Sequence, residues 1–173
     1  MLSSCNLTDE RCEYFYSFEE GDFNFFKYQL NDTHYFSNKS GKRYFLVYES
    51  FNDSNYSYSD ENTIYFECEN DREYYNHLNK TYYFSSNIPS RTMDSNTYIY
   101  RSTDHNKPVI IRIAGDYFAF DFDGKSNTIY CDSILPNGAC KIDSHTSDKS
   151  FIYYCLDKGI ELIFNGNDTL YHE

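Results

Sequence analysis

The sequence contains no tryptophan, only three alanines and three prolines, and no apolar stretch near the roughly 20 residues that a membrane-spanning helix needs. Because alanine is the strongest helix former, its scarcity argues against a helical bundle. Also absent are a C-x-x-C cysteine pair, a G-x-S-x-G nucleophile elbow, an H-E-x-x-H zinc motif and a glycine-rich phosphate loop. We therefore expect a protein that is not an enzyme and that has no cofactor and no metal site.

Basic side chains are scarce too, since 15 Lys and Arg stand against 27 Asp and Glu, for a net charge of −12. Abundant Tyr, Phe, Ile and Asn with little Gly, Ala and Pro are typical of AT-rich coding and suggest a parasite or a large DNA virus as the source. AT-rich coding also favours Lys, so it does not explain the acidity. A negative surface repels nucleic acid and speeds encounter with basic partners. The acidity predicts a basic protein partner, with plain solubility as the alternative.

The sequence does contain many aromatic residues in strand-like alternation. Its 20 Tyr and 15 Phe favour strands over helices. In one segment Phe118, Phe120 and Phe122 share a face, and the Asp123-Gly124 turn that follows predicts a hairpin into residues 128–131. Ten segments with such alternation predict strands at 14–18, 23–28, 44–48, 64–68, 98–101, 109–113, 117–122, 128–131, 151–156 and 160–164.

Short strands separated by turn signals predict an all-β fold within one domain over residues 1–173. We expect a single antiparallel β-sandwich, with a small lipocalin-like β-barrel as the alternative. The one helix candidate is the segment 70–78, in which Tyr74 and Leu78 would share a helical face. The segment 42–48 is similar to the tyrosine-rich strand of arthropod salivary lipocalins, although the tryptophan-containing strand with which that family opens is missing.

Cysteine usage predicts disulfide bonds. The six cysteines form an even set without zinc-like spacing. Fifteen complete pairings of six cysteines are possible. Two of them flank the turn signal 136–138 and could pair across it. The predicted disulfide residues are Cys5, Cys12, Cys68, Cys131, Cys140 and Cys155.

Asparagine usage predicts a glycoprotein. Seven Asn-x-Ser/Thr acceptors occur, where chance would give about three from 17 Asn and 29 Ser and Thr. The first five residues show no apolar leader segment, and we interpret the chain as a mature secreted protein or an extracellular ectodomain. The predicted glycosylation sites are Asn6, Asn31, Asn38, Asn52, Asn55, Asn79 and Asn167.

Two groups of acidic residues suggest catalysis or metal binding, although neither forms a complete motif. Paired carboxylates, Glu19 with Glu20 and Asp121 with Asp123, are what a hydrolase of the glycosidase type would use, and they form the enzymatic alternative. The segment 121–124 resembles the start of a calcium loop, but the later ligands are missing, so a hairpin turn is the better interpretation. The five histidines are scattered in polar segments, as is typical of solvated loops.

The remaining interpretation is recognition of another molecule. Tyrosine offers large, fairly rigid contact area with a polar tip, and acidic neighbours would steer a basic partner. The predicted partner-binding residues lie in the central polar segments and are Tyr56, Tyr58, Asp60, Glu61, Glu69, Asp71, Glu73, Tyr74 and Tyr75.

The sequence thus predicts a secreted acidic glycoprotein from a parasite or virus. It would capture a basic host protein, such as a chemokine, cytokine or complement factor, in immune evasion. One alternative is a small-ligand carrier with a barrel cavity. Another is a viral or parasite surface domain that binds a receptor or a glycan. The oligomeric state stays open.

Overall fold

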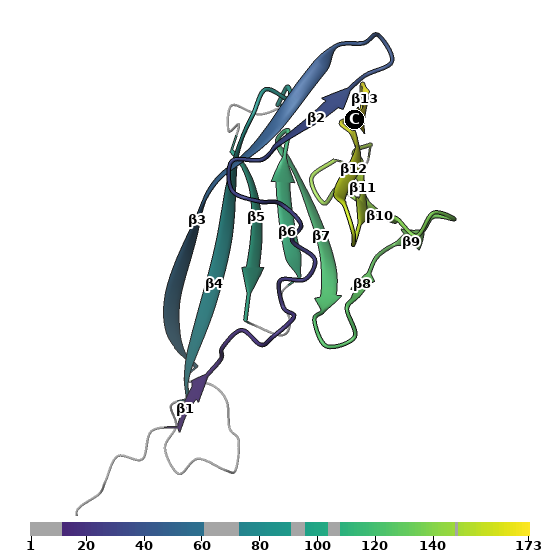
Figure 1. Cartoon of the computed structure of the whole chain (residues 1–173). Helices are drawn as coiled ribbons and strands as arrows, with labels where there is room; N and C mark the ends of the chain where they lie inside the picture. Colours follow the sequence, from purple (N-terminus) through teal and green to yellow (C-terminus); the bar gives the residue numbers. More distant parts are fainter. Residues whose placement is uncertain (1–11, 61–72, 91–95, 104–107, 148) are drawn as a thin grey trace, which may run out of the picture.

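A computed structural model describes residues 12–60, 73–90, 96–103, 108–147 and 149–173, with backbone alone for 12–15, 56–60 and 73–76. Within these residues the chain forms strands and turns and no helix (Figure 1). The all-β prediction is therefore confirmed. The strands are β1 (Cys12–Phe15), β2 (Thr33–Ser37), β3 (Arg43–Asp60), β4 (Glu73–Ser86), β5 (Thr97–Ser102), β6 (Val109–Ile113), β7 (Asp116–Asp123), β8 (Thr128–Tyr130), β9 (Ser133–Ile134), β10 (Cys140–Asp143), β11 (Phe151–Cys155), β12 (Gly159–Phe164) and β13 (Thr169–His172).

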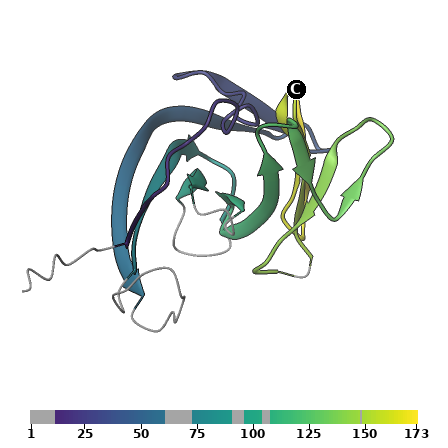
Figure 2. The same cartoon turned by 90° about the horizontal axis from the view of Figure 1, so that it is seen from below.

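All of these strands belong to one continuous sheet. Its order is β8-β7-β6-β5-β4-β3-β2-β13-β12-β11-β10-β9, with every neighbouring pair antiparallel, while β1 pairs with β4 in parallel off this path. Figure 2, which shows the molecule from below, shows that the sheet curls into a half-barrel. The curl places β7 against β11, where the rings of Phe120 and Tyr154 lie 5.1 Å apart. The antiparallel architecture is confirmed, and it takes the form of a single curled sheet.

The two ends of the sheet meet along one line. The edge strands β8 and β9 are joined by only two residues, Cys131 and Asp132. An isolated antiparallel bridge joins Phe118 of β7 to Ser144, just after β10. A disulfide bond between Cys131 and Cys140 ties the two-residue link to β10 and confirms the pairing suggested by the turn signal. We call this line of contact between the sheet ends the seam.

Alternation explains why these segments form strands. In β6 and β7 buried and half-buried residues alternate almost without exception, so that Ile111, Ile113, Phe118 and Phe120 point into the core. The hairpin predicted from Asp123-Gly124 is also confirmed. Its turn is held by the Asp123 carboxylate, which accepts hydrogen bonds from the Lys125 backbone N–H and the Ser126 hydroxyl.

The strand predicted at 23–28 is wrong, because these residues form a turn-rich segment that fills the curl. Gly21 and Gly124 approach so closely that a Cβ on Gly21 would lie 2.6 Å from the Gly124 carbonyl oxygen, a contact that only glycine permits. The turn sends Phe25 into full burial against the rings of Phe120 and Phe122. The buried Tyr154 hydroxyl donates a 2.5 Å hydrogen bond to the Phe25 carbonyl oxygen.

The predicted helix at 70–78 is also wrong in its described part. Residues 73–78 form the first half of β4 and pair with β3 from Asp60↔Glu73 to Asn55↔Leu78. Residues 70–72 lie outside the described residues, as does the strand predicted at 64–68. A strand here gains backbone partners on both sides, from β3 and β1, which an isolated short helix would lack. No helix that is long and apolar enough to cross a membrane occurs in the described part of the chain.

Candidate binding site

The predicted partner-binding residues divide into two groups. Tyr56, Tyr58 and Asp60 lie in the distal half of β3, and Glu73, Tyr74 and Tyr75 open β4. Strand pairing brings these six together, since Tyr58 stands opposite Tyr75 and Asp60 opposite Glu73. Their side chains, together with the whole of Glu61, Glu69 and Asp71, lie outside the described residues. The placement of this set as a binding surface therefore stays a prediction.

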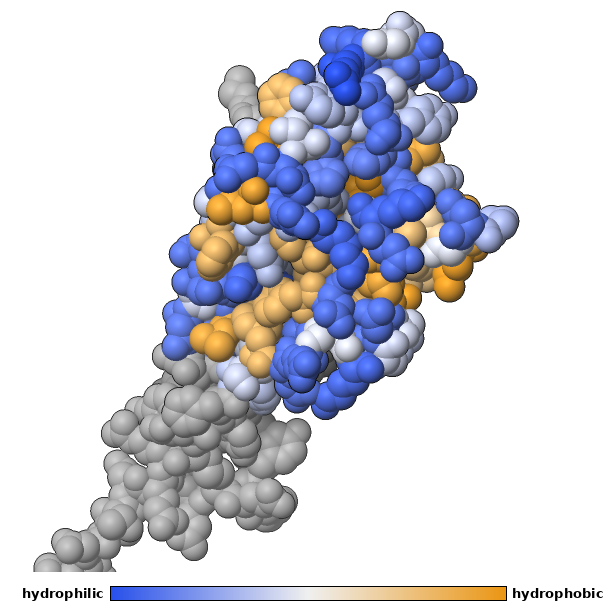
Figure 3. All heavy atoms as spheres, in the orientation of Figure 1, coloured by the Kyte–Doolittle hydropathy of each residue, from blue (hydrophilic) through white to orange (hydrophobic). Residues whose placement is uncertain are grey.

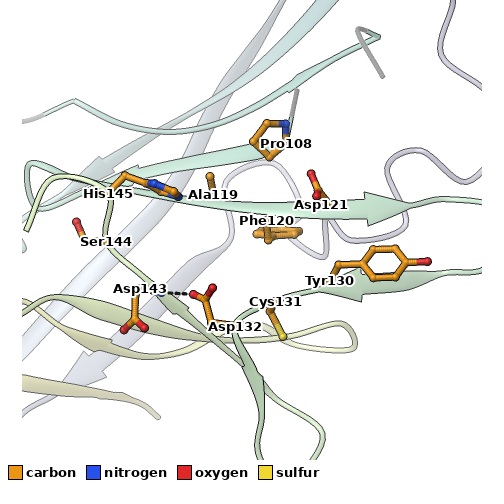
Figure 4. Close-up of a pocket in the computed structure, with 10 residues that line it drawn as sticks. All are labelled: Pro108, Ala119, Phe120, Asp121, Tyr130, Cys131, Asp132, Asp143, Ser144 and His145. Atoms are coloured by element: carbon orange, nitrogen blue, oxygen red, sulfur yellow. Dashed lines mark hydrogen bonds between the residues drawn. The ribbon is translucent and has the colours of Figure 1, made fainter. Parts of the chain in front are cut away.

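A different site, whose lining residues are all described, lies at the seam, where the two ends of the sheet border an open pocket of about 540 Å³ (Figure 4). β7 and β8 form one wall, and the two-residue link with the end of β10 forms the other. We call it the seam pocket. It is lined by Pro108, Ala119, Phe120, Asp121, Tyr130, Cys131, Asp132, Asp143, Ser144 and His145.

Three carboxylates give the seam pocket its charge. Asp121 lies on β7 opposite Tyr130 of β8, and Asp132 is the second residue of the link that follows β8. The Oδ2 atom of Asp132 accepts a 3.2 Å hydrogen bond from the backbone N–H of Asp143, drawn dashed in Figure 4. This bond anchors the link to β10. The disulfide at Cys131 fixes the same link covalently, so two independent contacts hold Asp132 in place.

Neutralising charges are few in the seam pocket. Asp143 forms an ion pair with Lys141 at 2.5 Å. Asp121 and Asp132 have no ion-pair partner within the described ranges. The nearby Arg101 side chain donates to the Phe122 carbonyl oxygen and faces Asp22 at 3.8 Å. Asp121 also attracts the Arg101 guanidinium electrostatically, although the two groups form no ion pair. Among the described residues, the pocket thus keeps two carboxylates that no ion pair neutralises.

An aromatic wall stands beside these charges. Phe120 is almost fully buried behind the pocket, whereas Tyr130 at its rim is 56% exposed. Tyrosine rings attract cations through their electron-rich faces, and exposed aromatic side chains are common in binding surfaces. The combination of carboxylates and an exposed tyrosine suits an ammonium or guanidinium group.

A row of side chains on the outer face of the sheet extends from the same strand. Register places Tyr83 of β4, Tyr98 of β5, Arg112 of β6 and Tyr117 of β7 directly opposite one another. The Arg112 guanidinium lies 5.0 Å from the centre of the Tyr117 ring. Burial and the hydrogen bond with Tyr117 raise the pKa of Tyr98. This outer row reaches the seam pocket along β7, because alternate residues from Tyr117 share one face of the strand.

A second aromatic area has an internal partner. On the side of the molecule seen in Figure 3, apolar surface is visible among hydrophilic side chains. Phe51 is 54% exposed, and the Lys80 ammonium lies 4.7 Å from its ring and 5.1 Å from that of Phe23. Asp53 pairs with the same ammonium at 3.6 Å. The aromatic rings of this cluster therefore already have a cation from within the chain, unlike the exposed ring of Tyr130.

One member of each carboxylate pair in the enzymatic alternative has a structural partner. Glu19 forms an ion pair with Lys125 at 2.9 Å. Hydrogen bonds from Ser126 and Lys125 hold the pKa of Asp123 below its ordinary value. A glycosidase acid needs a raised pKa instead. Among the residues that the structure describes, no group of three side chains is arranged to hold a metal ion.

The predicted glycosylation sites differ in access. Asn31, Asn52, Asn55 and Asn167 are exposed. The Nδ2 atom of Asn38, which would carry a glycan, donates a 2.6 Å hydrogen bond to Asp168. Asn79 is 8% exposed and accepts a hydrogen bond from the Tyr100 hydroxyl. Asn6 lies outside the described residues.

The remaining cysteines complete the predicted set. Cys155 of β11 carries a free, half-buried thiol. The side chains of Cys5, Cys12 and Cys68 lie outside the described residues. The structure therefore tests the disulfide prediction at three positions, of which Cys131 and Cys140 are paired.

Comparison with known proteins found no matching family model, no matching curated protein and no matching solved structure. The assignment of a function rests on the geometry of the chain itself.

Proposed function

We propose that the protein is an extracellular acidic binding module that captures a basic protein, and that the seam pocket receives a Lys or Arg side chain of that partner. The observation that carries the proposal is the pair Asp121 and Asp132, two carboxylates without an ion-pair partner among the described residues, beside the exposed ring of Tyr130. An incoming cation would meet both an opposite charge and an aromatic face.

The charge of the whole chain supports the same partner. A net charge of −12 attracts basic proteins over about a Debye length, roughly 8 Å at physiological salt. This attraction raises the association rate, whereas the affinity depends on close contacts at the interface. The seam pocket supplies such contacts. The disulfide holds its link in place before binding, which lowers the entropic cost of ordering the site.

The packing of the interior favours a surface binder over the small-ligand carrier. Phe25 fills the inside of the curl, and Tyr28 and Tyr154 lie buried around it. The seam pocket instead opens at the surface, since its three carboxylate residues are exposed. A protein side chain can enter such a pocket while its backbone stays outside.

Secretion is part of the proposal. The Cys131–Cys140 disulfide supports it, because such bonds persist in oxidising compartments and are rare in the cytosol. Four accessible glycosylation acceptors point the same way.

The test is a binding screen on the secreted full chain against extracellular proteins of high and low isoelectric point. We expect binders only in the basic group, with association rates that fall as salt rises. The double variant D121N/D132N should raise the Kd for the tightest binder by about 30-fold, which corresponds to a loss of about 2 kcal/mol from two charged contacts.

A control variant separates the pocket from the overall charge. E49Q/D157N removes the same two negative charges from exposed positions outside the pocket. It should slow association slightly and leave the dissociation rate unchanged. Equal losses in the two double variants would refute the role of the seam pocket, and a screen without basic binders would refute the function.

A further inference from the structure

Two histidines meet where the two halves of the curled sheet join. The Nδ1 atom of His34 on β2 lies 3.1 Å from the Nε2 atom of His172 on β13, a hydrogen-bonding distance. One of the two nitrogens must be an unprotonated acceptor, because two protonated imidazoles have only donors to offer. The contact therefore requires at least one neutral histidine.

The second nitrogen of His34 makes the neutral form necessary. Its Nε2 atom is buried and has no hydrogen-bond partner among the described residues. If His34 donates from Nδ1 to His172, a bare Nε2 is compatible with this environment. A protonated His34 would instead place a charged N–H group there without an acceptor, which is strongly unfavourable.

The strand junction around this pair is short. β2 and β13 pair at only two positions, Tyr171↔Ser37 and His172↔Phe36, with a further backbone hydrogen bond from the Glu173 N–H to the Tyr35 carbonyl oxygen. Two contacts flank the junction, a hydrogen bond from Asn38 to Asp168 and an exposed ion pair between Arg43 and Glu173. On one side of the junction the sheet continues through β3 to β8, and on the other through β12 to β9. Separation of β2 from β13 would thus divide the sheet at its middle.

Aromatic and charged neighbours define the setting of the pair. The Tyr28 ring packs edge-on against His34 at 4.8 Å, and the Phe36 ring packs against His172 at 5.2 Å. The Tyr28 hydroxyl oxygen accepts a hydrogen bond from the Ile160 N–H, which ties the pair to β12. The charged groups that face the pair are Asp32, Lys158, Glu161 and Glu173.

These neighbours favour neutral histidines on balance. Burial lowers the pKa of His34, the charge of His172 lowers it further, and Asp32 opposes both. Burial likewise lowers the pKa of His172, against the opposing effect of Glu161 and Glu173. When the folded pKa lies below the ordinary value of about 6.5, the unfolded chain binds protons first as the pH falls. The stability that the neutral pair supplies is complete above pH 6.5 and is lost below it.

We propose that His34 and His172 form an acid-operated latch that holds β2 to β13 at neutral pH and releases the junction in an acidic compartment. The latch lies on a different part of the sheet from the seam pocket, and it is independent of the proposed binding function. Protonation places two like charges about 3 Å apart and removes the hydrogen bond between the imidazoles.

The test measures hydrogen exchange of the full chain at pH 7.5 and pH 5.0, corrected for the intrinsic pH dependence of exchange. Between pH 7.5 and pH 5.0 we expect the equilibrium constant for opening of β2 and β13 to rise by up to about tenfold for each unit by which folding lowers a histidine pKa. Strands β6 and β7 serve as the internal reference, and their opening should change less than threefold. A uniform response across the sheet, or none in β2 and β13, would overturn the proposal.

Variants connect this response to the two side chains. In H34Q/H172Q the selective response of β2 and β13 to acid should disappear, whereas H145Q, which changes an exposed histidine outside the pair, should keep it. If the double variant responds like the natural chain, the latch is refuted. A titration of the histidine ring signals by NMR tests the unaltered protein as well. Both His34 and His172 should titrate below pH 6.5, and a midpoint at or above 6.5 for either would contradict the latch.

Discussion

The Cys131–Cys140 disulfide offers the most direct test of how the sheet ends are held together. The two residues are nine positions apart, so the bond closes a small loop of the unfolded chain. Loop-closure entropy for this length corresponds to about 2.5 kcal/mol of stability at 25 °C. In a chain of 173 residues, a loss of that size lowers the unfolding midpoint by about 5–10 °C.

The double variant C131A/C140A should show this loss in thermal or denaturant unfolding followed by circular dichroism. Substitution is preferable to chemical reduction because it leaves the other cysteines untouched. C155A is the matched control, since it removes a thiol that forms no disulfide, and its midpoint should stay within about 2 °C of the natural chain. A loss below about 1 kcal/mol in the double variant, or an equal loss in C155A, would refute the reasoning.

Three further predictions concern the interior and the surface. Y154F removes the hydroxyl that donates to the buried Phe25 carbonyl oxygen, and we expect a loss of about 1–3 kcal/mol in urea unfolding; an unchanged midpoint would contradict it. G159A and G138A both place a Cβ at a positive φ, but only the Cβ at position 159 would lie 2.5 Å from the Tyr28 hydroxyl oxygen. We therefore expect G159A to lower the free energy of unfolding by over about 1 kcal/mol more than G138A does. Equal losses in the two variants would refute the contact. After expression through a eukaryotic secretory pathway, intact-glycopeptide mass spectrometry should find glycans at the exposed acceptors Asn31, Asn52, Asn55 and Asn167. It should find none at Asn38 and Asn79, whose side chains form hydrogen bonds within the fold. The reverse pattern would contradict the fold.

Local patterns in the sequence predicted the local structure well. Alternation of buried and outward positions is a property of each strand alone, and it identified β6, β7 and β11 without knowledge of their partners. The same holds for the Asp123-Gly124 hairpin and for the Cys131–Cys140 bond, in which the two ends are close in sequence. In both cases the residues that interact lie within about ten positions of one another, so the pattern was visible in the local sequence.

Contacts between segments that are distant in the sequence were not predicted. Residues 23–28 have the aromatic content of a strand, yet their conformation depends on the approach of Gly21 to Gly124, about a hundred residues away in the sequence. The pairing of β2 with β13 joins segments near opposite ends of the chain. Neither contact leaves a local signal. The curl of the single sheet involves both contacts, and the sequence predicted a sandwich, with a small barrel as the alternative, where the structure has one curled sheet.

The seam pocket was not predicted from the sequence for the same reason. Its carboxylates come from β7, the two-residue link and β10, and only the meeting of the sheet ends brings them together. In the sequence Asp121 appeared as a partner of Asp123, and acidic residues near position 70 appeared more promising. A usable signal was present in Cys131-Asp132, because a disulfide residue beside an acidic one indicates a carboxylate held on a rigid link.

The way the sheet protects its edges also creates the candidate site. Exposed edge strands invite pairing with other chains, and short edge strands reduce that risk. Here β8 has three residues and β9 has two, and the chain runs directly from one to the other. The short connection links the two edges, which do not pair with each other, and the pocket lies at this junction. Because the disulfide and the Asp132 hydrogen bond fix this arrangement, the carboxylates stay near one another despite their repulsion. A basic partner would relieve that repulsion, which connects the closure of the sheet to the binding that we propose.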